Sequence, residues 1–359
     1  MSLDPLYKNA LTDSIWSIPQ DYETLFDWNY SDDRQDLLNL YGKGKDSQWD
    51  AETRIDWSQE LNSTDAFGMP EELFPLFGSD VYNKMSVKEK SALRYQYQAY
   101  LTSQFLHGEQ GALLCAAKIV QNVPNAESKF YAATQVMDEA RHVEAYKKLI
   151  EKFGVSYPIT GPLKTLLDQV LRDKRWDMTY LGMQVVIEGL ALAAFANIRD
   201  TATNNLASSV NAYVMQDEAR HVAFGRLSLR EYYPELSQYE RDEREEFVVE
   251  ACYLMRDRFR SDDLWDTLGL PAKECARHQE ESYGMQVFRT ALFSRIVPVV
   301  KDIGLWGPKI QDGYGKMGIL GFAQQNIDDL QENDARVADE YDARRNHVES
   351  MINKGRETS

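Results

Sequence analysis

The word DEARH occurs twice in the sequence, in VMDEARHVEAY at residues 136–146 and in MQDEARHVAFG at residues 215–225. Each copy places a glutamate three residues before a histidine, and in a helix this spacing puts both side chains on one face. A lone glutamate precedes each copy, in GEQGALLCAAKIV at 108–120 and in IEGLALAAFANIR at 187–199. One offset of 79 residues relates three pairs: Glu109 with Glu188, Glu139 with Glu218, and His142 with His221. The repeat therefore predicts two similar helical hairpins that pack into one bundle.

The composition is that of an ordinary soluble globular protein. The chain has 359 residues, of which 43% are apolar and 27% are charged, and its formal net charge is −17. This charge argues against a nucleic-acid partner, because phosphate binding needs clustered lysine and arginine. The three cysteines form no CxxC pair, so neither a disulfide scaffold nor a thiolate zinc site is expected. No signal peptide is recognised, and the longest apolar run, residues 181–198, contains Glu188. We therefore expect a cytoplasmic protein that does not enter a membrane.

Helical patterns dominate from residue 86 onward. Long helices are predicted at about 86–121, 124–154, 175–201 and 204–233, with a short helix after Pro162. Residues 1–85 are expected to form short helices and loops around the core, anchored by Trp49 and Trp57. Residues 236–359 are expected to form three or four further amphipathic helices. The predicted fold is all-α, with a wrapping extension at 1–85, a four-helix bundle at 86–235 and a helical segment at 236–359 packed on the bundle.

The repeated residues place four carboxylates and two imidazoles near the axis of the predicted bundle. Glu109 and Glu188 lie in otherwise apolar runs, so their side chains are expected to point into the core. Four buried carboxylates without cations would be too costly, because an unpaired charge loses its hydration. Oxygen and imidazole ligands in this number suit two bridged iron ions, or a mixed Mn/Fe pair. A chance Glu-x-x-His on a solvated helix face is the alternative for either copy alone, but it does not account for the repeat.

On these motifs, residues 86–235 resemble the carboxylate-bridged di-iron oxygenases and their ferritin-like relatives. The D-E-x-R-H form is similar to that of the bacterial multicomponent monooxygenase hydroxylases, and ring epoxidases of coenzyme A thioesters belong to the same wider group. The resemblance implies a ferritin-like bundle with these metal ligands: Glu109, Glu139, His142, Glu188, Glu218 and His221. It also implies that Asp138 and Asp217 hydrogen-bond the ligand histidines and so fix the imidazole orientation. The alternative for each aspartate is an ion pair with the arginine three residues on, Arg141 or Arg220, and both contacts are compatible.

Two positions depart from the patterns of particular members. Arylamine N-oxygenases of this superfamily carry a seventh ligand, a histidine four residues before the second Glu-x-x-His, where this chain has Val214. Toluene- and methane-type hydroxylases carry a threonine four residues after the third-helix glutamate, where this chain has Leu192. Gln135 and Gln184, each one turn before a predicted ligand, are the side chains expected to face the site instead.

Tyr146 follows His142 by four residues, the spacing at which the small subunit of ribonucleotide reductase keeps its radical tyrosine. A shared helix face would let the phenol approach the metals, and a core tyrosine bonded to a neighbour is the alternative. Glu109 argues against a true reductase subunit, because those proteins usually have aspartate there. The tail NKGRETS at 353–359 also lacks the tyrosine needed to pass a radical on.

Together these features predict an O2-dependent di-iron monooxygenase that hydroxylates or epoxidises a small apolar or aromatic substrate. No flavin, nicotinamide or iron–sulfur motif is present, so a separate ferredoxin or reductase is expected to supply electrons. The alternatives are an N-oxygenase or desaturase on the same scaffold, an R2-like Mn/Fe radical-forming oxidase, and a ferroxidase without organic substrate. A homodimer is an alternative to a single chain. Side chains one turn from the ligands are expected to line the substrate pocket: Thr102, Phe105, Leu106, Leu113, Phe195, Val214 and Gly225.

Overall fold

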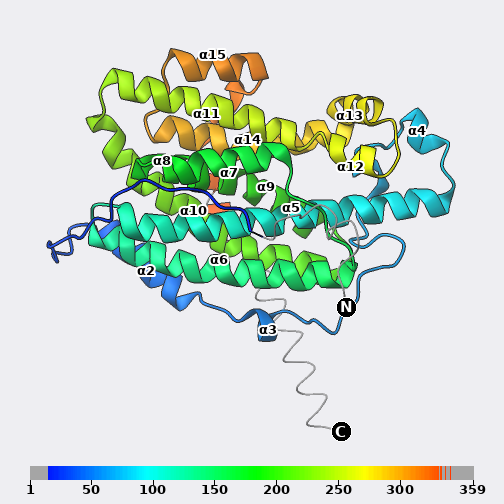
Figure 1. Ribbon diagram of the computed structural model, residues 1–359, viewed down its shortest axis with the longest axis horizontal. Coiled ribbons are helices and arrows are strands. Elements are labelled where there is room, and N and C mark those ends of the chain that lie inside the picture. The colour runs from blue at the N-terminus through cyan, green and yellow to red at the C-terminus, as the bar shows by residue number, and fades with distance from the viewer. Residues whose placement is uncertain (1–14, 331, 334–335, 337–339, 341–359) are drawn as a thin grey trace, which may run out of the picture.

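A computed structural model describes residues 15–330, 332, 333, 336 and 340 of the chain. Every regular element in these residues is a helix, and the axes of the longest helices are roughly aligned (Figure 1). The predicted all-α fold is therefore confirmed. Residues 1–14 and the tail NKGRETS lie outside the described residues. The division into three segments stays a prediction.

Four long helical runs make the centre of the molecule. α5 (Val87–Asn122) lies beside α6 (Ala126–Phe153), and α9 (Glu188–Thr201) lies beside α10 (Asn205–Tyr232). Ser86 and Glu89 form a capping box at the start of α5, and Gly154 ends α6 in the left-handed conformation with a φ of 68°. These signals are readable in the sequence, and the predicted helix limits agree with the observed limits to within two residues.

The third long helix is interrupted, whereas a continuous helix was predicted over 175–201. α8 (Trp176–Tyr180) leads into the π-helical turns η2 (Leu181–Ile187), and α9 begins directly at Glu188. All seven residues of η2 are buried, so its apolar pattern gives no periodicity that separates a π-helix from an α-helix. Gly225 of α10 packs against this stretch, because a Cβ there would lie 2.6 Å from Cβ of Gln184. π-Helical turns are rare and are frequent at functional sites.

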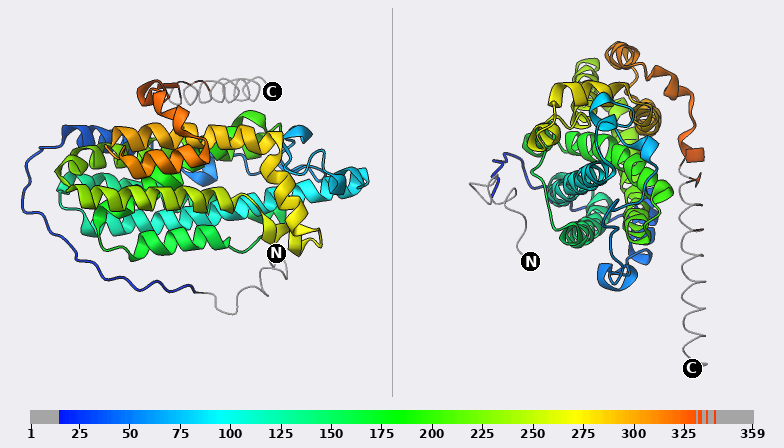
Figure 2. Two further views of the ribbon diagram at one scale, coloured as in Figure 1. Left: turned by 90° about the horizontal axis from the view of Figure 1, so that it is seen from above. Right: turned by 90° about the vertical axis from the view of Figure 1, so that its right-hand side faces the viewer.

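Shorter helices cover the four central runs. α2 (Gln35–Asp46) and α3 (Ala51–Arg54) lie against α6, while α4 (Asp80–Asn83) lies at one end, near α12 (Asp262–Thr267) and α13 (Ala272–Glu281) (Figure 1). The opposite side carries α7 (Gly161–Arg172), α11 (Gln238–Arg258), α14 (Tyr283–Asp302) and α15 (Pro308–Met317) (Figure 2). Three short 3-10 turns complete the described elements: η1 (Glu71–Leu73), η3 (Tyr233–Glu235) and η4 (Leu320–Gln324). The described part of the C-terminal segment thus has these five α-helices, where three or four were predicted, and residues 327–330 are also helical.

The run Trp176–Thr201 is long and apolar enough to cross a membrane, and it is the one such run in the described residues. However, 83% of its most apolar window is buried inside the protein. α10 and α14 pack against α9, which forms the second half of this run. A helix that is apolar on all sides is typical of the core of a large bundle.

Candidate metal centre

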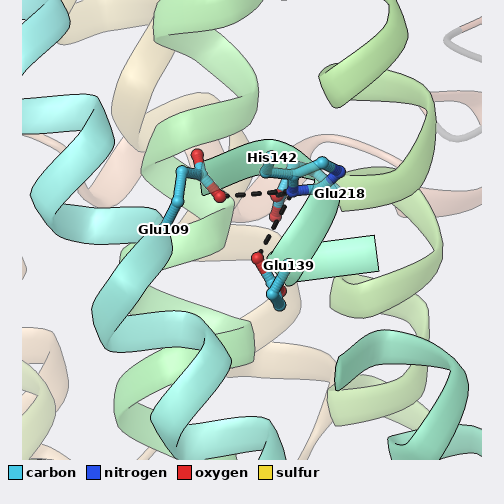
Figure 3. Close-up of side chains that lie close together, drawn as sticks. All are labelled: Glu109, Glu139, His142 and Glu218. Carbon is cyan, nitrogen blue, oxygen red and sulfur yellow. Dashed lines mark hydrogen bonds and ion pairs between the residues drawn. The ribbon is translucent and has the colours of Figure 1, made fainter. Parts of the chain in front are cut away.

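The six repeated residues meet inside the bundle. Figure 3 shows Glu109, Glu139, His142 and Glu218 turned toward one another. Each of the six residues is at most 5% exposed. In each of two overlapping groups, one candidate ligand atom per residue lies within 4.8 Å of the others: Glu109, Glu139, His142 and Glu218 form one group, and Glu139, Glu188, Glu218 and His221 form the other. Glu139 and Glu218 belong to both groups. They are therefore placed to bridge two ions, with one histidine on either side.

Both histidines turn the same nitrogen toward the centre. His142 Nδ1 lies 3.1 Å from Glu218 Oε1, 3.2 Å from Glu109 Oε2 and 3.3 Å from Glu139 Oε2. His221 Nδ1 lies 3.1 Å from Glu139 Oε1 and 3.5 Å from Glu218 Oε2. The two imidazole ring centres are 5.9 Å apart. The helical repeat therefore produces two similar half-sites that face one another.

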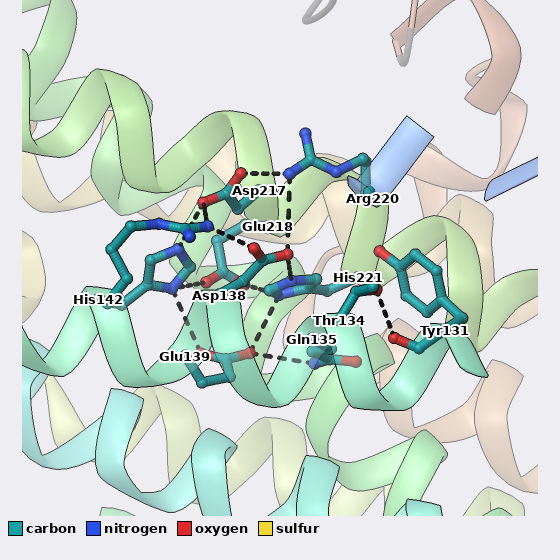
Figure 4. Close-up of polar contacts among 12 residues, drawn as sticks. Tyr131, Thr134, Gln135, Asp138, Glu139, His142, Asp217, Glu218, Arg220 and His221 are labelled. Carbon is teal, nitrogen blue, oxygen red and sulfur yellow. Dashed lines mark hydrogen bonds and ion pairs between the residues drawn. The ribbon is translucent and has the colours of Figure 1, made fainter. Parts of the chain in front are cut away.

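The opposite nitrogen of each histidine is bound by an aspartate (Figure 4). His142 Nε2 lies 3.0 Å from Asp217 Oδ2, and His221 Nε2 lies 3.3 Å from Asp138 Oδ2. Each aspartate therefore supports the histidine of the other DEARH copy, not the histidine of its own. A carboxylate at this position keeps a proton on Nε2, which leaves the Nδ1 lone pair free for a metal.

The aspartates also form the ion pairs that were considered as the alternative. Arg141 pairs with Asp138 of its own helix and donates to Asp217 Oδ2 at 3.0 Å. Arg220 pairs with Asp217 of its own helix and lies 3.8 Å from Asp138 Oδ2. The two kinds of contact therefore coexist, and the arginines join the two aspartates into one network.

Gln48 and Trp49, in the segment that precedes α3, complete this network. Neither residue was predicted to be part of the site. Gln48 Nε2 donates to Asp138 Oδ1 at 2.8 Å, and Trp49 Nε1 donates to Asp217 Oδ2 at 2.7 Å. The Arg141 guanidinium lies 4.7 Å from the Trp49 ring centre. Trp49 is therefore more than the anchor that was expected. The one available signal was chemical, because the N–H of a half-buried indole usually finds an acceptor.

Gln135 and Gln184 face the cluster, as expected. Gln135 Nε2 donates to Glu188 Oε1 at 2.8 Å and to Glu139 Oε1 at 3.1 Å. Gln184 Nε2, from the π-helical turns, donates to Gln135 Oε1 at 3.3 Å. Both side chains are fully buried. Gln135 thus connects Glu139 of the first hairpin with Glu188 of the second hairpin.

The protein groups alone leave the cluster with unusual protonation. Burial and repulsion from Glu218 raise the pKa of Glu109 to about 8, and the same causes raise the pKa of Glu188 well above its usual range. Burial opposes a charge on His142 and His221, but the surrounding carboxylates outweigh it and raise both pKa values well above the usual value. Protons on these groups therefore take the place that cations would take.

The donor set fits two divalent ions. The buried side-chain atoms that have no hydrogen-bond partner among the described residues include four atoms of the candidate ligands: Glu139 Oε2, Glu188 Oε2, Glu218 Oε2 and His221 Nδ1. When all four glutamates are ionised they carry four negative charges, and the two aspartates are balanced by two arginines. Two divalent ions supply the four positive charges that are missing. This buried set is therefore suited to a di-iron or Mn/Fe centre.

Tyr146 is fully buried next to the cluster. Its hydroxyl donates to Asn211 Oδ1 at 3.0 Å, and its ring lies 5.6 Å from that of Phe105 and 5.8 Å from that of Phe195. Burial, followed by the charges of Glu109 and Glu218, raises its pKa well above the usual value. The hydroxyl contact is the one expected of a core tyrosine.

A small cavity of about 30 Å³ touches the cluster, and Glu109, Glu188 and Glu218 form part of its wall. Phe105 and Phe195 line it, as predicted. The other five predicted pocket residues are not among its lining residues: Thr102, Leu106, Leu113, Val214 and Gly225. Sequence reasoning missed a further wall, at the end of α11, formed by Met255, Arg258 and Phe259. A second, apolar cavity of about 80 Å³ shares three lining residues with the first: Phe105, Ala194 and Phe259.

A sequence model of the p-aminobenzoate N-oxygenase AurF family matches residues 31–304, which include every residue of the cluster. The chain belongs to this family. It is therefore a di-iron oxidoreductase of the ferritin-like oxygenase superfamily. The departure at Val214 does not separate it from the AurF family, although it removes the histidine expected there.

Solved structures share the fold at low sequence identity. An R2-like ligand-binding oxidase with a Mn/Fe cofactor is 15% identical with a TM-score of 0.53, and the match covers 77% of this chain and 96% of that chain. The dimanganese(II)-NrdF of Streptococcus sanguinis is 14% identical with a TM-score of 0.50, and the match covers 81% of this chain and 99% of that chain. No curated protein matches the sequence.

Proposed function

We propose that the protein is an O2-dependent di-iron oxygenase that adds oxygen to the amine nitrogen of a small aromatic substrate. The observation that carries this proposal is the cavity that touches Glu109, Glu188 and Glu218 on one side and aromatic walls on the other. Membership in the p-aminobenzoate N-oxygenase family supports the amine as acceptor. Hydroxylation or epoxidation of a ring carbon is the second candidate. Val214 favours it, because the chain lacks the seventh ligand expected of arylamine N-oxygenases.

We assign metal ligation to the six residues of the repeat: Glu109, Glu139, His142, Glu188, Glu218 and His221. When bound, the metal pair supplies the O2 chemistry, with electrons from a separate ferredoxin or reductase. Glu109 and Glu188 face the cavity, so a substrate would approach from their side. The Gln135 amide N–H donates to Glu188, and the Gln184 amide donates to Gln135, so the two glutamines hold the Glu188 carboxylate in place. Phe105 and Phe195 exclude water from the reacting side.

The proposal is tested by aerobic turnover of the iron-loaded protein with a chemical reductant and isotopically labelled O2. Two ions per chain and labelled oxygen on the nitrogen of p-aminobenzoate or a related aryl amine are the expected results. Benzoate and toluene, which lack the amine, test the second candidate. Iron-dependent O2 uptake that none of these substrates alters would contradict both oxygenase readings and favour the ferroxidase. The same amount of free iron in buffer without the protein is the control.

Tyr146→Phe separates the oxygenase from an R2-like radical-forming oxidase. We expect turnover to be retained, because the Tyr146 hydroxyl is occupied by Asn211. Loss of that donor leaves a buried amide oxygen unpaired and should cost about 1–3 kcal/mol of stability. Tyr131→Phe is the matched control, since Tyr131 is also buried on α6 and its hydroxyl has no partner among the described residues. A tyrosyl radical signal after oxygenation that disappears only in Tyr146→Phe, together with turnover, would establish the radical reading.

A further inference from the structure

Arg258 is a buried arginine with no carboxylate within ion-pair distance among the described residues. Four arginines of the described residues are at most 9% exposed: Arg141, Arg226, Arg244 and Arg258. Three of them have carboxylate partners, with Arg226 at 2.7 Å from Asp302 and Arg244 at 2.9 Å from Asp177. Arg258 makes neither an ion pair nor a hydrogen bond within the described part of the chain, although the charge of Glu109 acts on it, and its guanidinium lies 5.7 Å from the ring centre of Phe259.

The missing partner does not reflect a lack of nearby acids. On the same stretch, Arg256 pairs with Asp257 at 2.6 Å, and Arg260 pairs with Asp262 at 3.1 Å. The side chains of Arg256 and Arg260 are 38% and 41% exposed, so water already solvates their charges and the ion pairs add little stability. The sequence around Arg258 thus supplies acids to its solvent-facing neighbours and none to the buried side chain.

The position of Arg258 explains why an unpaired charge is useful there. Arg258 lines the small cavity together with Glu109, Glu188 and Glu218. Burial lowers the pKa of Arg258 to about 10, so the guanidinium is still protonated at neutral pH. Once two ions occupy the centre, the charges of those glutamates are directed to the metals. The cavity then has a free cation on one wall, and a buried charge in that state is costly.

We propose that Arg258 binds the anionic group of the substrate, and that this group is a carboxylate. A guanidinium presents parallel N–H donors that match both oxygens of a carboxylate, which a neutral amide cannot do. Phe105 and Phe259 line both cavities, so an aromatic ring held by its carboxylate lies between aromatic walls. The role of the bound anion as substrate rests on the proposed oxygenase function. Arg258 is then the residue that selects acids over their neutral analogues.

The test compares benzoate with benzamide as ligands of the iron-loaded protein, by calorimetry. A charge-assisted pair predicts a preference of at least about tenfold for benzoate in the wild type. Arg258→Met should remove the preference, and Arg258→Lys should keep part of it, because the charge stays but the fork is lost. Arg256→Met, on the same helix and exposed, is the matched control and should leave the preference unchanged. The melting temperature of Arg258→Met should not fall, since the variant loses an uncompensated charge.

Two results would overturn this inference. Equal affinities of the wild type for benzoate and benzamide would show that no anion site exists. An undiminished preference in both Arg258 variants would show that the carboxylate binds the iron directly. Failure of the proposed oxygenase function would give another result. O2 uptake would be absent, while the preference for benzoate over benzamide would still depend on Arg258. Each variant is checked for two bound ions, so that metal loss is not mistaken for loss of the anion site.

Discussion

Glu139→Ala is expected to lose most of the bound metal, falling from two ions per chain to fewer than one. The two oxygens of Glu139 point in different directions, with Oε1 at 3.1 Å from His221 Nδ1 and Oε2 at 3.3 Å from His142 Nδ1. The substitution therefore removes one donor from each half-site at once. Loss of an outer-sphere partner alone costs about 10–100-fold in metal affinity, so a shared ligand should cost at least about a hundredfold.

The measurement is metal content after dialysis, followed by the melting temperature with and without iron. Iron should raise the melting temperature of the wild type, because a ligand that binds only the folded state stabilises it, and should not raise that of Glu139→Ala. The metal-free variant should remain folded, since Glu109 and Glu218 still contact His142 and Glu218 still contacts His221. Glu144→Ala, exposed on the same helix, controls for the substitution itself. Retention of both ions by Glu139→Ala would refute the bridging assignment.

The sequence alone located the cluster because its information is periodic. A glutamate and a histidine three residues apart must share a helix face, and a repeat at one offset must form two similar faces. Glu109 and Glu188 were placed in the core by the apolar residues around them. The start of α5 at Ser86 and the end of α6 at Gly154 likewise depend on residues that are close together in the sequence. Local geometry therefore determined which residues meet.

The remaining features depend on how separate segments pack, which no spacing records. Arg258 reaches the cavity from α11, outside the repeat, and it looks in the sequence like its surface neighbours Arg256 and Arg260. Trp49 reaches Asp217 across 168 positions of the chain. The π-helical turns before Glu188 occur in a run that is buried on all sides, so no polar face marks their register. Long-range contacts and a fully apolar segment thus account for what sequence reasoning missed.

Substitution of an aspartate that pairs with the histidine of the other DEARH copy is expected to lower metal affinity strongly. Asp217→Asn keeps the size of the side chain but removes the charge that faces His142 Nε2 at 3.0 Å. We expect metal affinity to fall by about 10–100-fold, because the imidazole loses the group that fixes its tautomer and orientation. The half-site weakened should be that of Glu109 and His142, although Asp217 belongs to the other DEARH copy. Apparent Fe²⁺ affinity, measured by chelator competition, reports the loss.

A double-mutant cycle distinguishes the crossed arrangement from support within one helix. Asp217→Asn combined with His142→Gln should be non-additive in the free energy of metal binding, by about 0.5–3 kcal/mol, because the two side chains are in contact. Asp217→Asn combined with His221→Gln should be closer to additive, since His221 Nε2 is bonded to Asp138. The reciprocal cycles with Asp138→Asn should show the opposite preference. Coupling of each aspartate to the histidine four residues later on its own helix would contradict the crossed network. Crossed coupling would mean that each half of the repeat needs the other to hold its metal, so neither hairpin could bind an ion properly alone.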